Sequence, residues 1–298
     1  MNSTVEDSAN TNNGLVGPAT QGLVQLFLLS VLLLAIYYSV LVSLERQWWE
    51  DPNYSHGFLV PIFCAWVIWK RKDRLQLLPS APSWCGFFVT VVGIGILLLG
   101  ELGAENFLAR VSLLIVLAGL VIQFRGWSFF RVLLFPWAAL FLMIPLPAII
   151  FNEISLPLQF GASRLGSWLL TIVGVPVLRE GNVIQMSSLT LDVAEACSGL
   201  RYLISLITIA IIYGYLNEPK SSRRVWLVLA AIPVAIGANG LRIMGSGIIG
   251  EYWSPEKAEG FFHTFSGLVV FAISLLLLVL LHGAFGLTDR LQRPGSTS

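Results

Sequence analysis

Three side chains with chemical potential lie at the edges of long apolar segments. Cys197 stands in the run Glu195-Ala196-Cys197-Ser198-Gly199-Leu200-Arg201, Arg242 in Asn239-Gly240-Leu241-Arg242, and His263 begins the last apolar segment. A thiol, a guanidinium and an imidazole together can attack a carbonyl carbon, stabilise the oxyanion and move a proton. For this chemistry, the three side chains must lie at the same level of the folded protein.

Composition places these residues in a membrane protein. Of 298 residues, 56% are hydrophobic and 12% are charged, whereas soluble domains have about 25% charged residues. The net charge of +1 gives no reason to expect nucleic acid as a partner. We predict an all-α polytopic membrane protein in contact with lipid.

The apolar segments predict about eight transmembrane helices, since one span needs about 20 apolar residues. The second segment is short and contains Pro61, which we expect to interrupt it. The predicted spans cover residues 22–44, 57–70, 83–100, 107–124, 129–151, 197–216, 225–249 and 263–285.

The region between the fifth and sixth spans differs from the rest. Residues 152–175 have apolar side chains at mixed helical spacing, together with Arg164 and Trp168, which favours a helix lying in the external membrane interface; a ninth span is the alternative. Residues 183–186 and 189–193 flank Ser187-Ser188 and predict a short hairpin before the sixth span.

Basic residues predict the orientation. They gather in the loops after the second, fourth, sixth and eighth spans, which the positive-inside rule makes cytoplasmic. The sequence thus predicts a polar cytoplasmic tail over 1–21, one integral membrane domain over 22–285, and a cytoplasmic tail over 286–298. Residues 1–21 contain no Lys or Arg, unlike a cleavable signal peptide. In this topology Cys197, Arg242 and His263 all face the outside.

Each candidate also has a structural interpretation. Free cysteines are often inert core residues, and we interpret Cys64 and Cys85 in that way. Cys197 differs because a helix N-terminus stabilises a thiolate, and Arg201 shares its helix face. Arg242, next to Asn239 on one face, could instead pair with a carboxylate or reach the interface. His263 could be merely interfacial, and His56 is a second external candidate.

Metal binding is a poor fit, because no His or Cys pair has ligand spacing. We therefore expect neither a metal nor another cofactor.

The motifs together resemble the exosortase/archaeosortase family. The resemblance rests on Ser55-His56-Gly57-Phe58-Leu59-Val60-Pro61, on the Cys197, Arg242 and His263 blocks in that order, and on Gly174–Asn182. It implies a cysteine transpeptidase of the bacterial cytoplasmic membrane, with its active site facing the periplasm or exterior. Its implied partners are exported proteins that carry a C-terminal Pro-Glu-Pro-type motif, a transmembrane helix and a basic tail. Cys197, Arg242 and His263 match the catalytic positions, with Arg201, Asn239, His56 and Glu195 as possible supporting residues.

Two other function classes remain open at this stage. A membrane acyltransferase that modifies cell-surface glycans could use the same thiol. A transporter in surface polysaccharide export could use Arg242 and His263 as substrate or proton sites near the membrane midplane. The predicted position of these residues at the outer edge argues against the transporter.

Overall fold

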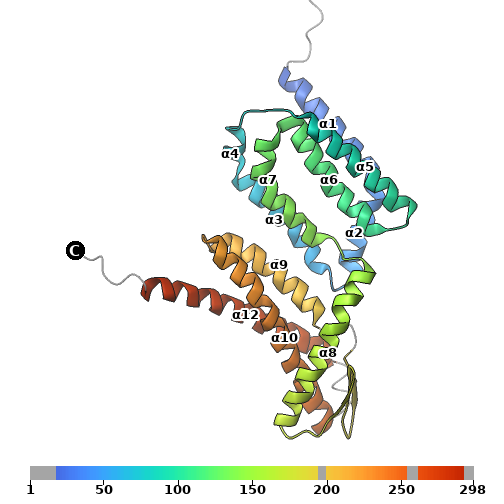
Figure 1. The fold of residues 1–298 in the computed structure, drawn as a ribbon, viewed down its shortest axis with the longest axis vertical. Coiled ribbons are helices and arrows are strands. Elements are labelled where there is room, and N and C mark those ends of the chain that lie inside the picture. Colours follow the sequence, from blue (N-terminus) through green and yellow to red (C-terminus); the bar gives the residue numbers. More distant parts are fainter. Residues whose placement is uncertain (1–17, 194–198, 254–260, 292–298) are drawn as a thin grey trace, which may run out of the picture.

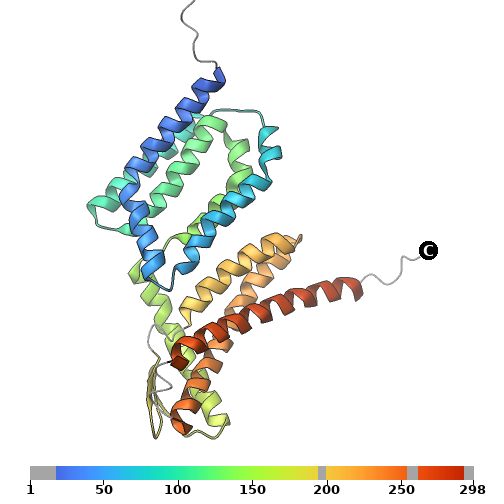
Figure 2. The same ribbon diagram turned by 180° about the vertical axis from the view of Figure 1, so that it is seen from behind.

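The computed structural model describes residues 18–193, 199–253 and 261–291. Helices α1 to α7 form one group, and α9, α10 and α12 form a second group beside a small sheet, with α8 leading from the first group to the second (Figure 1). The view from behind shows α12 reaching away from α10 toward the C-terminus (Figure 2).

The first group is built from antiparallel apolar helices. Its members are α1 (Pro18–Ile36), α2 (Tyr38–Glu50), the 3₁₀ turn η1 (Ser55–Phe58), α3 (Leu59–Lys70), α4 (Lys72–Gln76), α5 (Trp84–Leu102), α6 (Asn106–Arg125), α7 (Trp127–Ala139) and the 3₁₀ turn η2 (Leu140–Met143).

The second group carries the candidate site. It comprises α8 (Ala148–Ile172), the strands β1 (Leu178–Glu180), β2 (Val183–Gln185) and β3 (Thr190–Asp192), and the helices α9 (Leu200–Asn217), α10 (Ser221–Tyr252) and α12 (Phe261–Leu291).

The chain is a polytopic, mainly helical membrane protein, but the predicted count of eight spans is not confirmed. Five helices among the described residues are long and apolar enough to cross a membrane, and the number rises to seven if two bent pairs each count as one span. The segment Ser55–Lys70 is apolar but shorter than a full span. Helix length and composition therefore give five to seven membrane crossings among the described residues.

One predicted span is bent, and one predicted boundary is wrong. The first predicted span is divided at Tyr37, where α1 and α2 meet at 65°. The fifth, predicted to reach residue 151, ends earlier: α7 with η2 and the following α8 meet at 77°. The sequence between them contains Pro145 and Pro147, which lack an N–H group and push the preceding residue out of the helical region. The break therefore comes before residue 152.

Pro61 does not interrupt the second apolar segment. It lies in the first turn of α3, where the missing N–H would have no helical partner in any case.

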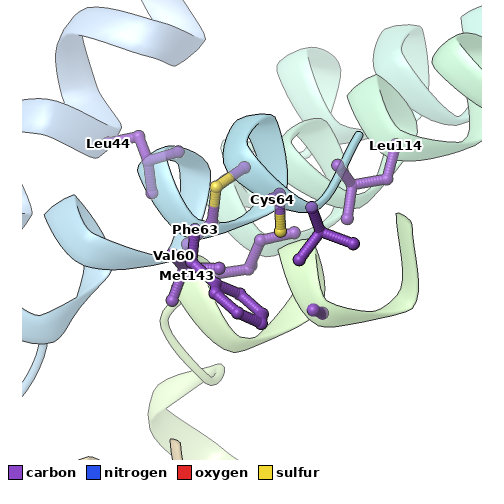
Figure 3. Packing of buried hydrophobic residues seen from close by; sticks show 9 residues of the cluster. Leu44, Val60, Phe63, Cys64, Leu114 and Met143 are labelled. Carbon is purple, nitrogen blue, oxygen red and sulfur yellow. The ribbon is translucent and has the colours of Figure 1, made fainter. Parts of the chain in front are cut away.

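A dense apolar cluster joins the first group. Leu44 of α2, Val60, Phe63 and Cys64 of α3, Leu114 of α6 and Met143 of η2 meet in it (Figure 3). The Sγ of Cys64 donates to the carbonyl of Pro136 at 3.1 Å, and the side chain is buried. This environment confirms the interpretation of Cys64 as a core residue. Cys85, by contrast, is exposed, so its interpretation as a core residue is wrong.

The predicted hairpin is confirmed, and the structure adds a third strand. β2 and β3 pair antiparallel with Ile184 opposite Leu191, and β1 pairs with the other edge of β2. Ile184 and Val193 enter an apolar cluster with Ala162 and Leu170 of α8 and Ile243 of α10. The sheet is thereby fixed to the helices that carry the site.

The helix predicted between the fifth and sixth spans is present as α8, although it begins at Ala148 rather than 152. Its buried positions toward α10 are mostly small, as is usual where helices approach closely in membranes; a side chain at Gly166 would overlap Ile243. Ile154, Trp168 and Arg164 are among its exposed residues. Its predicted place in the membrane interface stays a prediction.

Candidate functional site

A cavity of about 720 Å³ opens at the N-terminal end of α9. Four regions line it: the segment 52–59 with η1, the first turns of α9, the middle of α10 and the beginning of α12. Its polar lining includes Asn53, His56, Arg201, Tyr202, Ser205 and Arg242. The volume lies in the range of about 300–1,000 Å³ that is typical of binding sites for small molecules and side chains.

The structure thus brings together three of the predicted site residues. His56 comes from η1, Arg201 from the first turn of α9 and Arg242 from α10. Their sequence separations are large, so only the packing of these elements makes them neighbours. No Asp or Glu belongs to the lining in the described ranges.

Tyr202 organises the two arginines. The Cζ atom of Arg242 lies 5.5 Å from the centroid of the Tyr202 ring, and that of Arg201 lies 5.9 Å from the same centroid. Arg242 is 5% exposed, whereas Arg201 is exposed. Cation–π contacts contribute roughly 0.5–2 kcal/mol, compared with a cost of about 2.5–3.5 kcal/mol for an arginine at the centre of a membrane helix. Stacking therefore offsets part of the cost of Arg242.

Sequence reasoning did not identify Tyr202 as a site residue. A tyrosine in an apolar helix is ordinarily a packing residue, so its position next to Arg201 gave only a weak signal. The spacing did contain a usable hint, because Tyr202 and Ser205 are three residues apart and share a helix face.

His56 is buried, and Leu142, Ser205 and the backbone of Asn53 all contact its ring. Its Nε2 lies 3.2 Å from the carbonyl oxygen of Leu142, and its Nδ1 lies 3.5 Å from the Oγ of Ser205. A carbonyl only accepts hydrogen bonds, so Nε2 carries the proton in this contact. The neutral ring then presents Nδ1 toward Ser205 as an acceptor. This geometry gives His56 the capacity to take a proton inside the cavity.

Asn239 anchors the entry to α9. It is 1% exposed, and it lies against Gly199, where an added Cβ would come within 2.9 Å of the Asn239 Cγ. Gly199 also has φ of +80°, a conformation that side-chain-bearing residues rarely adopt. Gly199 and Asn239 therefore pack closely against each other. Asn239 lies about one helical turn before Arg242.

The remaining predicted residues have a different status. Cys197 and Glu195 lie outside the described residues. His263 belongs to the first turn of α12, four residues before Gly267, which lines the cavity. A Cβ at Gly267 would overlap the hydroxyl of Tyr202, so α12 meets α9 closely at this level. Among the described residues, no group of three or more His, Cys, Asp or Glu side chains is arranged to hold a metal ion.

The sequence model of the transmembrane exosortase family matches residues 48–280. The chain belongs to this family. The match spans every element that lines the cavity, from η1 to the beginning of α12. This exosortase-family chain matches no curated protein and no solved structure. Family membership confirms the resemblance found in the motifs and makes the chain a membrane protein of a family of sorting transpeptidases.

Proposed function

We propose that the chain is a membrane-embedded cysteine transpeptidase or protease that cleaves C-terminal sorting signals of exported proteins. The main support for this proposal is the cavity at the N-terminal end of α9. Three separate elements contribute His56, Arg201 and Arg242 to its lining. Cys197 precedes Gly199 by two residues in the sequence, and this proximity in the chain supports Cys197 as the nucleophile of the proposed site. His263 precedes the cavity residue Gly267 by one helical turn.

In the first step, the Cys197 thiolate attacks the carbonyl carbon of the scissile peptide bond. A tetrahedral oxyanion forms, and Arg242 stabilises it by charge and hydrogen bonding. The carbon–nitrogen bond then breaks, His263 gives its proton to the departing amine, and a thioester remains.

In the second step, an acceptor nucleophile attacks the thioester carbonyl. An amine acceptor gives a new amide, whereas water gives a carboxylic acid; in both cases the acceptor's proton passes to His263, which regains its acid form, and the carbon–sulfur bond breaks to regenerate the Cys197 thiolate. His56 is suited to help at either stage, since its Nδ1 can accept a proton while Nε2 remains bonded to Leu142.

The family and the predicted depth of the site support the proposed substrate class. The expected substrates carry a Pro-Glu-Pro-type motif, a transmembrane helix and a basic tail. Such a helix would hold its scissile bond at the outer membrane interface of the bacterial cytoplasmic membrane. The distribution of basic residues among the loops supports a site on that outer, periplasmic side, by the positive-inside rule.

Co-expression with a tagged candidate substrate tests the activity. Mass analysis of the product should reveal a new C-terminus at the motif, extended by the acceptor in transpeptidation or free in hydrolysis. An uncleaved substrate in cells that contain folded protein would contradict the proposal. Reporter fusions at residues 75, 185 and 221 test the orientation: only residue 185 should lie outside.

A further inference from the structure

A second cavity lies near the opposite end of α9 from the candidate site. Arg71, which follows α3, contacts Tyr215 in the last turn of α9. Arg201 lies in the first turn of the same helix, about 20 Å away along its axis at 1.5 Å per residue. A cavity of about 330 Å³ is found next to Arg71.

Three arginines line this cavity. Arg71, Arg74 and Arg131 contribute to its wall with Ser128, and Leu78 and Val132 supply the apolar part. Within the described ranges no Asp or Glu belongs to the lining, and no ion pair of Arg74 or Arg131 is found. The neighbouring carboxylate on α4, Asp73, lies outside the lining. This concentration of positive charge has the chemistry of an anion site.

The three arginines are not equivalent. Arg71 donates to the carbonyl of Val132 and, at 2.6 Å, to the hydroxyl of Tyr215. It therefore ties α3 to α7 and α9 and is fixed in place. Arg74 and Arg131 are exposed, and their planar guanidinium groups can hold phosphate oxygens by paired hydrogen bonds. Ser128 lies in the first turn of α7, whose amide end adds partial positive charge.

Exposed tryptophans mark a membrane interface at the same level. Trp69 lies in the last turn of α3, Trp84 and Trp127 are the first residues of α5 and α7, and Trp226 lies in the second turn of α10. All four are exposed. Tryptophan is enriched at the headgroup level of bilayers. Lys70 and Lys72 lie within 6 Å of the Trp69 ring centroid, at 5.9 and 5.2 Å. The arginine cavity therefore lies where phospholipid headgroups are found.

The surroundings also provide a path for an acyl chain. Leu134 follows Arg131 by about one turn of α7 and is exposed, and Leu78 forms part of the cavity wall. A free phosphate ion would use the arginines but not this apolar surface. A phospholipid uses both.

We infer that the cavity formed by Arg71, Arg74, Ser128 and Arg131 binds the headgroup phosphate of an acidic phospholipid. Basic pockets between membrane helices on the side of positively charged loops commonly hold such lipids. The inference does not depend on the proposed peptidase activity. The bound lipid joins α3 and α4 to α7 at this end of the helices.

Native mass spectrometry of the purified full chain in detergent tests the inference, with phosphatidylglycerol as the probe and phosphatidylcholine as the neutral comparison. The test variant is the Arg74→Gln/Arg131→Gln pair, which leaves Arg71 and its contacts intact. The matched control is Lys72→Gln/Arg125→Gln: it removes the same charge from exposed residues on the same side that do not line the cavity.

The dissociation constant for phosphatidylglycerol should rise roughly fivefold for each arginine removed, and the control should change it by no more than about twofold to threefold. Equal retention by the test and control variants would overturn the inference, as would equally tight binding of phosphatidylcholine. Displacement of the lipid by millimolar inorganic phosphate would identify a free-anion site instead.

A second pair keeps the test decisive if the glutamine variant does not fold. Arg74→Lys/Arg131→Lys retains the charge but loses the planar fork, so a smaller loss of phosphatidylglycerol binding is expected, with unchanged binding of phosphatidylcholine. Binding identical to that of the unmodified protein would count against the site.

Discussion

At each end of α9 two arginines lie close to a tyrosine ring, but the surroundings of these arginines differ. At the N-terminal end, Arg201 and Arg242 approach the Tyr202 ring beside a cavity of about 720 Å³ without a carboxylate in its described lining. At the C-terminal end, Arg71 and Arg224 approach the ring of Tyr215 at 5.6 and 5.2 Å.

Around Glu218, just after α9, the charges have fixed partners. Arg224 Nε donates to the carbonyl of Glu218 at 2.7 Å. The carboxylate of Glu218 is buried, and its Oε2 lies 3.9 Å from Arg223 and 3.5 Å from His282. His282 also meets the hydroxyl of Tyr213 at 2.9 Å. This arrangement joins α9, α10 and α12.

The difference suggests separate tasks for the two ends. Cations that line a cavity can meet a substrate that enters it, whereas cations that contact the buried Glu218 carboxylate hold helices together. Substitutions near Tyr202 should therefore change catalytic rate, and substitutions around Glu218 should change stability. The following predictions test that division, from the largest expected effect to the smallest.

Replacing Cys197 should have the largest effect on activity. Cys197→Ala and Cys197→Ser should abolish processing of a co-expressed substrate because no thioester can form, while membrane accumulation stays normal. Cys64→Ala and Cys85→Ala are the controls and should retain activity, since neither thiol lines the cavity. Cleavage by Cys197→Ala would rule out the covalent mechanism.

His263→Ala should lower the rate on a peptide substrate by about 10²–10⁴-fold, the range of general acid catalysis. An activated ester should lose less, because its leaving group needs no proton. Rates on both substrates, measured with equal amounts of folded enzyme, check this. Equal losses would remove His263 from the acid role and make His56, in the cavity, the next residue to test.

Arg242→Lys should lose about 10²-fold or more, by analogy with deletion of an oxyanion donor, because a lysine does not reproduce the planar fork. Arg201→Lys is the matched control on the same tyrosine ring and should lose less, since Arg201 is exposed. Alkylation of Cys197 by a small reagent should persist in both variants. Similar losses in the two would erase the distinction between the arginines.

Gly267→Ala should reduce the rate roughly ten- to hundredfold, as small displacements at catalytic sites do. The new methyl group would overlap the Tyr202 hydroxyl, so the ring that both arginines contact must move. Gly237→Ala on α10, where a Cβ meets nothing within 4 Å, is the control. Full activity of Gly267→Ala would show that the position of Tyr202 does not matter.

Glu218→Gln should leave the rate per folded molecule unchanged and lower the free energy of unfolding by about 1–3 kcal/mol, through weakened charge-assisted hydrogen bonds. Thermal unfolding in detergent, followed beside activity, measures both. A loss of rate larger than the loss of folded protein would break the division between the two ends of α9.

The sequence by itself determined the class of protein and most of its apolar segments. Low charge and long apolar runs leave little alternative to helices, because backbone polar groups in lipid must be satisfied within the segment. The hairpin also followed from local alternation. The motifs around His56, Cys197 and Arg242 were sufficient for the family, which the match over residues 48–280 confirms.

Only the tertiary structure decided how segments break and which motif residues meet. The bends at Tyr37 and before α8 depend on helix packing and, before α8, on Pro145 and Pro147. A hydropathy pattern does not record the combined effect of these two prolines. The roles of Tyr202 and Ser205 arise because η1, α9, α10 and α12 converge on one cavity. Hydropathy records how deep a residue lies, but not which side of its helix faces a neighbour. That direction comes from close contacts such as Gly199 with Asn239 and Gly267 with Tyr202.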